Sequence, residues 1–252
     1  MSKDIWWIFF VFILIGIAWN LQRSGKILPQ TSPTTQESKT ATSTLKQYKI
    51  EISPEQVFEE KPEAEYISLQ NADYETKKDF VISELTLKNK GGNTAVIGKD
   101  LNEKTISLKN NERAIIISGK NPKENNFKLN KCSGYFEQSN SFTPPISTPC
   151  PRIANLTQAE NLKNSCIDFL DSLPACQTPK INFEGEIDQE CGAFFSKHAN
   201  YAGCVEDHKN DPDFDLKEWR IYLGKTTEFW SNRHDTIKLL DQNGNLVSEL
   251  AY

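Results

Sequence analysis

The sequence lacks the motifs that identify most nucleotide-binding proteins and serine hydrolases. It contains no Gly-rich phosphate loop and no Gly-x-Ser-x-Gly elbow, and it has only three histidines in 252 residues. Basic residues are not in excess, because 29 Lys and Arg stand against 34 Asp and Glu, a formal net charge of −5. Since a nucleic-acid partner needs a basic surface, this balance predicts no nucleic-acid partner.

Cysteine is absent from both ends of the chain. All six cysteines lie in one central segment: Cys132, Cys150, Cys166, Cys176, Cys191 and Cys204. An even number confined to one segment predicts three disulfides and an oxidising compartment outside the cytoplasm. A zinc site is the alternative, but it needs closely spaced Cys-x2–4-Cys pairs, and none occurs.

The pairing of these cysteines cannot be deduced from the sequence, because six cysteines allow many combinations. The spacing suggests one set. Cys132 and Cys150 bracket a Pro-rich loop and could pair locally. A small helical hairpin would then pair Cys166 with Cys204 and Cys176 with Cys191.

The first residues are the most hydrophobic part of the chain. Residues 5–19 (IWWIFFVFILIGIAW) include no charged side chain, and the run reaches seventeen residues with Leu21. Tryptophans stand near both ends of this run, where indole prefers the membrane interface. We therefore predict an uncleaved single-pass anchor in residues 1–26, in contact with the membrane through residues 5–21. A cleaved secretory signal is the alternative, although no small-residue cleavage pair follows.

Residues 27–45 are rich in Ser, Thr, Pro and Gln and show no apolar periodicity. Such a segment cannot bury enough apolar surface to offset its ordering entropy. It is predicted to be a flexible tether, with O-linked sugar as a possible addition.

Short alternating runs separated by turn residues fill the body, residues 46–252. The candidates are residues 48–52, 64–71, 80–87, 94–97, 105–108 and 113–117, followed by a hairpin in residues 236–252. In the hairpin, Asn243-Gly244 supplies the positive-φ residues of a primed turn. Strands of this length and spacing predict a mainly β chain with an antiparallel sandwich.

Four of these runs resemble the strand signatures of the lamin-tail domain: EYISLQN (65–71), VISELTL (81–87), ERAIII (112–117) and DTIKLLDQNGNLVSELAY (235–252). The family pattern has Gly-Trp where this chain has Glu84-Leu85, and Pro-Gly where it has Asn110-Asn111. The resemblance covers about half of the chain, Lys46–Gly119 and Trp219–Tyr252. It implies an immunoglobulin-like sandwich used for binding or structure, and membrane-anchored bacterial proteins with this domain have a similar layout.

The cysteine-rich segment, residues 120–215, is predicted to be an insertion in this sandwich, and we call it the insert. Two helices are expected in it. Residues 156–170 have helical apolar spacing, with Thr157 as N-cap and Glu160 completing a capping box. Residues 187–197 form the second candidate. A segment this small would be stabilised mainly by its cross-links.

Two clusters of polar residues could carry chemistry. His198 and His208, with Asp207, Asp211, Asp213 and Asp215, could hold a metal ion, although their spacing fits no tight ligand motif. Glu184, Glu186, Asp188 and Glu190 could act as acid and base. Carboxylates before a helix more often stabilise its N-terminus. Cys191 or Cys204 with His198 or His208 could form a catalytic pair, but disulfide bonding would make these sulfurs inert.

An aromatic set follows the insert. Trp219, Tyr222 and Trp230, together with Phe229, would form a binding surface if exposed, and they would anchor the insert to the sandwich if buried. The sequence thus predicts a non-enzymatic module without a cofactor. It would sit in the cell membrane with its body outside the cytoplasm and bind a protein or cell-surface polymer through the insert and the sandwich loops. The alternative is a metal-assisted hydrolase using the His198–Asp215 region.

Overall fold

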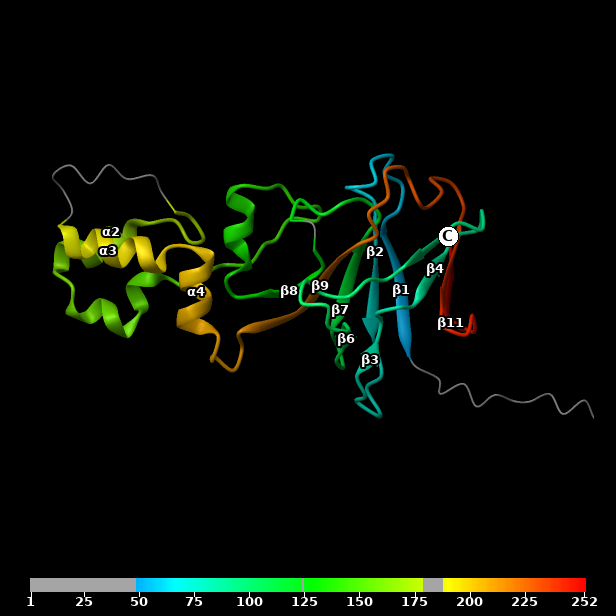
Figure 1. Cartoon of the computed structure of the whole chain (residues 1–252), viewed down its shortest axis with the longest axis horizontal. Coiled ribbons are helices and arrows are strands. Elements are labelled where there is room, and N and C mark those ends of the chain that lie inside the picture. Colours follow the sequence, from blue (N-terminus) through cyan, green and yellow to red (C-terminus); the bar gives the residue numbers. More distant parts are fainter. Residues whose placement is uncertain (1–48, 124, 179–187) are drawn as a thin grey trace, which may run out of the picture. The chain divides into compact units, whose positions relative to one another are not determined.

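The computed structural model describes residues 49–123, 125–178 and 188–252 (Figure 1). The chain separates into two units, Met1–Leu45 and Lys46–Tyr252, and all described residues belong to the second. The predicted anchor and tether lie outside the described residues. Within the described ranges, no helix combines the length and the apolar character needed to cross a bilayer.

The described body consists mostly of β-strands, with short helices and three disulfides. The strands are β1 (Ile50–Gln56), β2 (Tyr66–Asn71), β3 (Phe80–Val81), β4 (Thr86–Lys88), β5 (Thr94–Val96), β6 (Ser107–Leu108), β7 (Arg113–Ile117), β8 (Phe127–Asn130), β9 (Asp215–Tyr222), β10 (Thr236–Leu240) and β11 (Leu246–Ala251). The α-helices are α2 (Asn164–Ser172), α3 (Gln189–His198) and α4 (Tyr201–His208), and the 3-10 helices are η1 (Ser133–Gln138), η2 (Ile153–Asn155) and η3 (Thr157–Asn161).

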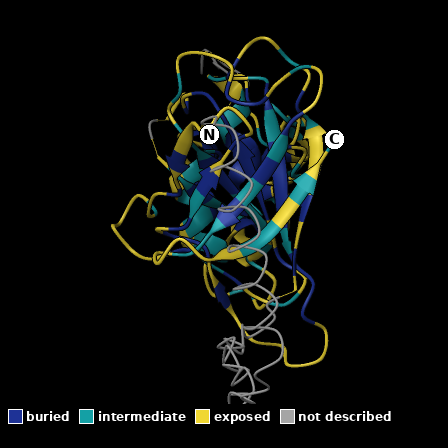
Figure 2. Ribbon diagram, turned by 90° about the vertical axis from the view of Figure 1, so that its right-hand side faces the viewer, coloured by how far each residue is buried: buried dark blue, intermediate teal, exposed yellow. Residues whose placement is uncertain are grey.

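Two main sheets pack over one shared core. A five-stranded sheet has the order β1-β2-β7-β9-β8, and a four-stranded sheet has the order β11-β10-β4-β5. Strands β3 and β6 form a small separate pair. The core takes inward-facing side chains from both sheets, such as Ile67 and Ile116 from the first and Leu87 and Leu239 from the second. Figure 2 shows buried positions concentrated on the strands and exposed positions on the loops between them.

The terminal hairpin forms as predicted, since β10 and β11 pair and β10 buries Ile237 and Leu239. The predicted primed turn is wrong. A type I′ turn needs two residues with positive φ, but only Gly244 has one, at 80°. The Gly244 N–H donates to the Asp241 carbonyl and the Asp241 N–H to the Asn245 carbonyl. The result is a three-residue loop with a bulge.

The single strand predicted over residues 80–87 is also wrong, because β3 and β4 are separate strands in different sheets. Ser83 breaks the run. Its buried hydroxyl accepts a hydrogen bond from the Ile106 N–H and donates to the Gly98 carbonyl. The next residue, Glu84, has a φ of 69°. The alternation of apolar and polar residues thus continues through the turn at Ser83 and Glu84, so hydrophobicity alone does not reveal the break between β3 and β4.

The sequence predicts an antiparallel sandwich, but the five-stranded sheet is mixed, because β7 and β9 pair in parallel. Parallel neighbours need a long crossover connection, and residues 118–214 supply it. Within this crossover, β8 turns back and pairs with β9, so part of the insert extends the sheet.

The described part of the insert contains three short α-helices where the sequence predicts two. The prediction of one helix over residues 156–170 is wrong. Residues 157–161 form the 3-10 helix η3, Leu162 is extended, and α2 begins only at Asn164. Thr157 makes no side-chain cap. The α3 helix lies close to its predicted range, and the Asp188 side chain caps it by accepting the Cys191 N–H at 2.9 Å.

Candidate functional site

Three disulfides hold the insert, as expected from the cysteine count, but the suggested pairing is wrong. The bonds are Cys132–Cys204, Cys150–Cys176 and Cys166–Cys191. Cys166 lies in α2 and Cys191 in α3, so their bond joins these helices. Cys132 lies just before η1, which contacts α4, and Cys204 lies in α4. The cysteines that pair are those that the packing of the helices brings together, and their spacing in the sequence does not reveal this packing. No described cysteine is free, so Cys–His chemistry has no thiol.

The two insert histidines do not converge on one site. His198 is 3% exposed, and its Nδ1 lies 2.6 Å from Asp207 Oδ2. Its ring packs on Phe194, a neighbour on α3, with centroids 4.4 Å apart. His208 instead pairs through Nδ1 with Asp211 Oδ2 at 3.0 Å. Each imidazole thus has its own carboxylate.

Asp211 and Asp213 both pair with Lys131, whereas Asp215 is exposed at the start of β9. Lys131 Nζ lies 3.0 Å from Asp211 Oδ2 and 2.5 Å from Asp213 Oδ1. The hydrogen bonds from His208 and then Lys131 lower the pKa of Asp211, and the Lys131 hydrogen bond lowers the pKa of Asp213. Among the described residues, no three His, Cys, Asp or Glu side chains gather as metal ligands would.

The acidic stretch before α3 is described only from Asp188 onward, and Glu184 and Glu186 lie outside the described residues. The Asp188 carboxylate caps α3 and pairs with Lys163 Nζ at 2.8 Å. The Lys163 hydrogen bond is the main reason why the pKa of Asp188 is lowered. Helix capping is thus the observed role of Asp188.

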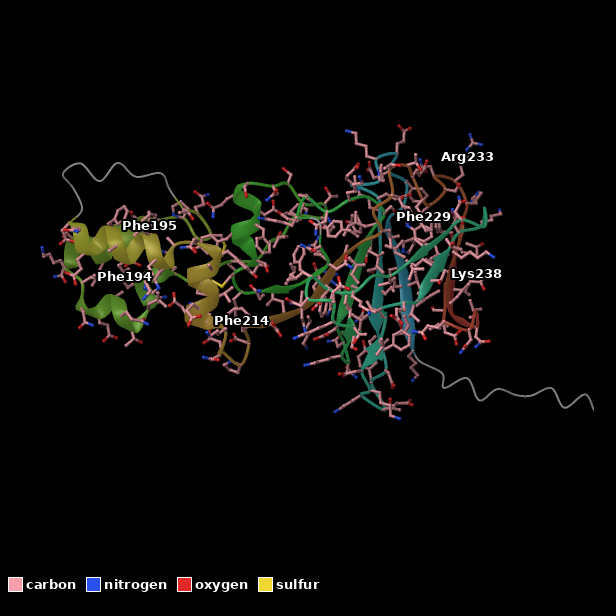
Figure 3. The ribbon with its side chains drawn as sticks, in the orientation of Figure 1. Phe194, Phe195, Phe214, Phe229, Arg233 and Lys238 are labelled. Atoms are coloured by element: carbon pink, nitrogen blue, oxygen red, sulfur yellow. A yellow bond between two sulfur atoms is a disulfide. The ribbon has the colours of Figure 1, made fainter. Side chains whose placement is uncertain are left out.

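The aromatic residues after the insert are mostly packed. Trp230 is 1% exposed and belongs to the shared core, with the Phe229 ring at 4.4 Å. Trp219 is half-buried, and Lys128 Nζ lies 5.8 Å from its ring centroid. Tyr222 is half-buried and stacks on Phe127 of β8. Figure 3 shows Phe229 among the strands of the two sheets.

Tyr222 connects β9 to the insert through its ring contact with Phe127. Its buried hydroxyl has no hydrogen-bond partner among the described residues. Burial raises the pKa of Tyr222 to about 12. Because this folded-state value exceeds the ordinary value of 10.0, the stability contributed by the protonated phenol is complete below pH 10. It is lost as the pH rises towards 12.

We expect Tyr222→Phe to be neutral or slightly stabilising at pH 8, since it removes an unpartnered buried hydroxyl. Between pH 8 and pH 11 the variant should lose less stability than the wild type, as measured by urea unfolding. Tyr74→Phe is the matched control, because the Tyr74 side chain is 59% exposed. Identical alkaline losses in the wild type and Tyr222→Phe would contradict the assignment.

The loop between β9 and β10 is fixed by two buried carboxylates. Glu65 is fully buried and accepts the N–H groups of Phe229 at 2.9 Å and Trp230 at 2.8 Å. Burial raises the pKa of Glu65 despite these donors. Asp235 is 3% exposed and accepts the N–H groups of Lys90, Ser231 and Thr236. The two carboxylates therefore anchor this loop through hydrogen bonds to its backbone.

An open cleft of about 570 Å³ lies between this loop and the turn that connects β4 to β5. Residues Asn89–Gly91 and Asn93 line one side, and residues 228–235 line the other. Lys90, Arg233 and His234 are exposed on it, and none of their side chains has a hydrogen bond or ion pair with another described residue. Figure 3 shows Arg233 extending outward from its loop.

The cleft is not predictable from the sequence. Its residues come from two loops about 140 positions apart, and neither loop contains a recognisable motif. The sequence offers only indirect signals of a charged site there: Lys88 and Lys90 alternate at the end of a strand, and His234 follows Arg233. Only the fold brings these groups together.

Comparison of the chain with protein-family models, with curated proteins and with solved structures finds no match in any of the three, so these comparisons assign no family.

Proposed function

We propose that this protein is a membrane-tethered, extracytoplasmic binding module without catalytic activity, built on an immunoglobulin-like sandwich of the lamin-tail type. The observation that carries the proposal is the disulfide-bonded insert. All six cysteines are oxidised in pairs, and structural disulfides of this density belong to oxidising compartments. The hydrophobic residues 5–21 supply the membrane anchor and residues 27–45 the tether, and the insert and sandwich loops supply the contact surface.

The backbone supports the lamin-tail assignment at the two places where the sequence departs from the family pattern. Glu84 and Asn111 stand where glycine is usual, and their φ angles are 69° and 60°. Glycine is favoured in this region because it has no Cβ. Leu85 replaces the usual tryptophan and is buried in the shared core. The substituted residues thus keep the backbone and burial that the pattern requires.

The signature polar residues also have structural roles that suit a fold motif. The Asn71 side chain is buried and donates to the Lys78 and Leu108 carbonyls. Asp241 accepts the N–H groups of Asn243 and Asn245 in the terminal loop. The Tyr252 hydroxyl donates to the Ser231 carbonyl at 3.0 Å. These contacts favour a scaffold, and the loops between the strands remain available for recognition.

The test uses the full chain, with a C-terminal epitope, in its native cells. A protease added outside intact cells should remove the epitope, and a membrane-permeant maleimide should label no cysteine until a reductant is added. An epitope protected from the protease, together with thiols labelled without reductant, would place the body in a reducing compartment and end the proposal.

A further inference from the structure

The outer face of the four-stranded sheet continues into the cleft as a band of positive charge. We call Lys88, Lys90, Arg233, His234 and Lys238 the basic stripe. Lys88 of β4 and Lys238 of β10 are directly opposite each other in the register. Their neighbours Leu87, Ile237 and Leu239 point into the core, so both lysines lie on the outer face. Lys90 follows two positions after Lys88 and lines the cleft with Arg233 and His234.

The stripe is costly to the folded protein in the absence of a ligand. Like charges directly opposite each other on neighbouring strands are destabilising. Lys238 has partial relief from Glu249, whose Oε1 lies 3.7 Å from its Nζ. Lys88 makes no ion pair or hydrogen bond through its side chain with another described residue. The fold therefore keeps cations close together without neutralising most of them.

The acidic groups near the stripe leave an excess of positive charge on its surface. Glu228 on the cleft and Glu249 on β11 are exposed. Asp235 is buried, and its carboxylate already receives three N–H groups. Four permanent cations thus face two exposed carboxylates, on a chain whose formal net charge is −5. The stripe is a local exception to the acidic composition.

We propose that the basic stripe binds a linear polyanion of the cell surface, a polymer that carries carboxylate or phosphate groups at regular intervals. Opposed residues on adjacent strands lie about 5 Å apart, and alternate residues along a strand about 7 Å apart. The stripe therefore presents cations at intervals that suit a repeating anion. Arg233 adds the planar donor fork that matches carboxylate and phosphate oxygens. This inference rests on the proposed extracytoplasmic function and names its ligand class.

The experiment uses the full chain held in neutral phosphatidylcholine nanodiscs. Three labelled probes are titrated by thermophoresis: polygalacturonate, inorganic polyphosphate, and vesicles containing phosphatidylglycerol. The stripe variant carries Lys88→Thr, Arg233→Ser and Lys238→Thr. The control carries Lys104→Ser, Lys109→Ser and Lys217→Thr, which are exposed positions with the same loss of three charges. A cooperative urea unfolding transition in each variant shows that it is folded.

We expect the wild type to bind one of the two polymers, with an affinity that falls as salt rises. The stripe variant should bind at least about tenfold more weakly in 50 mM salt and show a smaller salt dependence, since it releases fewer counterions. The control should stay within about twofold of the wild type. The polymer that binds identifies carboxylate or phosphate as the anion.

Three results would overturn the inference: no polymer binding by the wild type, equal weakening in both variants, or binding to the anionic vesicles alone. If the body is accessible to external protease but binds neither polymer, the ligand assignment fails while the proposed function stands. If the body is protected from external protease and its thiols are labelled without reductant, the proposed function fails first.

Discussion

Replacing Cys132 and Cys204 together by alanine should lower the free energy of unfolding of the insert by about 4 kcal/mol. The bond closes a loop of 72 residues, and the loss of chain entropy in the unfolded state grows with loop length. Both cysteines are buried, so a serine in their place would leave a hydroxyl without a hydrogen-bond partner, and alanine avoids this.

The Cys150→Ala/Cys176→Ala variant is the matched control, because its loop is only 26 residues long and its expected loss is about 1 kcal/mol smaller. Guanidinium unfolding of the body from residue 46 can be monitored with two probes. Far-ultraviolet circular dichroism at 222 nm reports mainly on the insert helices. Fluorescence reports on Trp219 of β9 and on Trp230, which lies in the shared core. Removal of Cys132–Cys204 should shift the first transition more than the second. A larger loss in the control variant would contradict the loop-length argument.

Arg220→Met should be the most damaging single substitution on β9, with an expected loss of about 3–5 kcal/mol. Arg220 is 3% exposed, and its Nη2 lies 2.8 Å from Glu218 Oε1. It also donates to the carbonyls of Pro144 at 2.6 Å and Pro145 at 3.3 Å, within the insert. Removing it leaves the carbonyls of half-buried Pro144 and exposed Pro145, and one oxygen of the largely buried Glu218 carboxylate, without this donor.

Arg113→Met is the control, because Arg113 contacts the other oxygen of Glu218, at 2.5 Å, and its side chain is 52% exposed. Exposed ion pairs contribute little, so this change should reduce stability by less than about 1 kcal/mol. Urea unfolding of both variants measures the difference. Similar losses for the two arginines would show that burial of Arg220 is not what makes it important.

Local patterns in the sequence predict the strands well where one face is buried. The alternation in residues 236–240 places β10 correctly, because period 2 reflects which side chains reach the core. The strand β7 is placed instead by a continuous apolar run, since four consecutive residues, Ala114–Ile117, are buried. The alternation rule misses the break at Ser83. A hydroxyl that hydrogen-bonds to two distant backbone groups leaves no trace in hydrophobicity.

Partners far apart in the sequence are beyond such patterns. The cysteine count predicts disulfides, but the actual pairs depend on how η1, α2, α3 and α4 pack. The cleft and the basic stripe likewise depend on β4 lying beside β10, across about 150 residues of chain. Local residue propensities do not encode contacts between such distant segments. By contrast, Glu65 and Asp235, the buried residues that fix the neighbouring loop, each begin one of the lamin-tail-like runs in the sequence.

The disulfide arrangement has a consequence for biosynthesis. The Cys132–Cys204 bond encloses all four other cysteines, since Cys150, Cys166, Cys176 and Cys191 lie between its ends. A chain that is exported from its N-terminus presents Cys132 and Cys150 to an oxidant before any other cysteine, and these two are not partners. Oxidation in order of emergence would therefore trap a wrong bond, and correct maturation calls for an isomerase or for delayed oxidation until Cys204 has crossed the membrane.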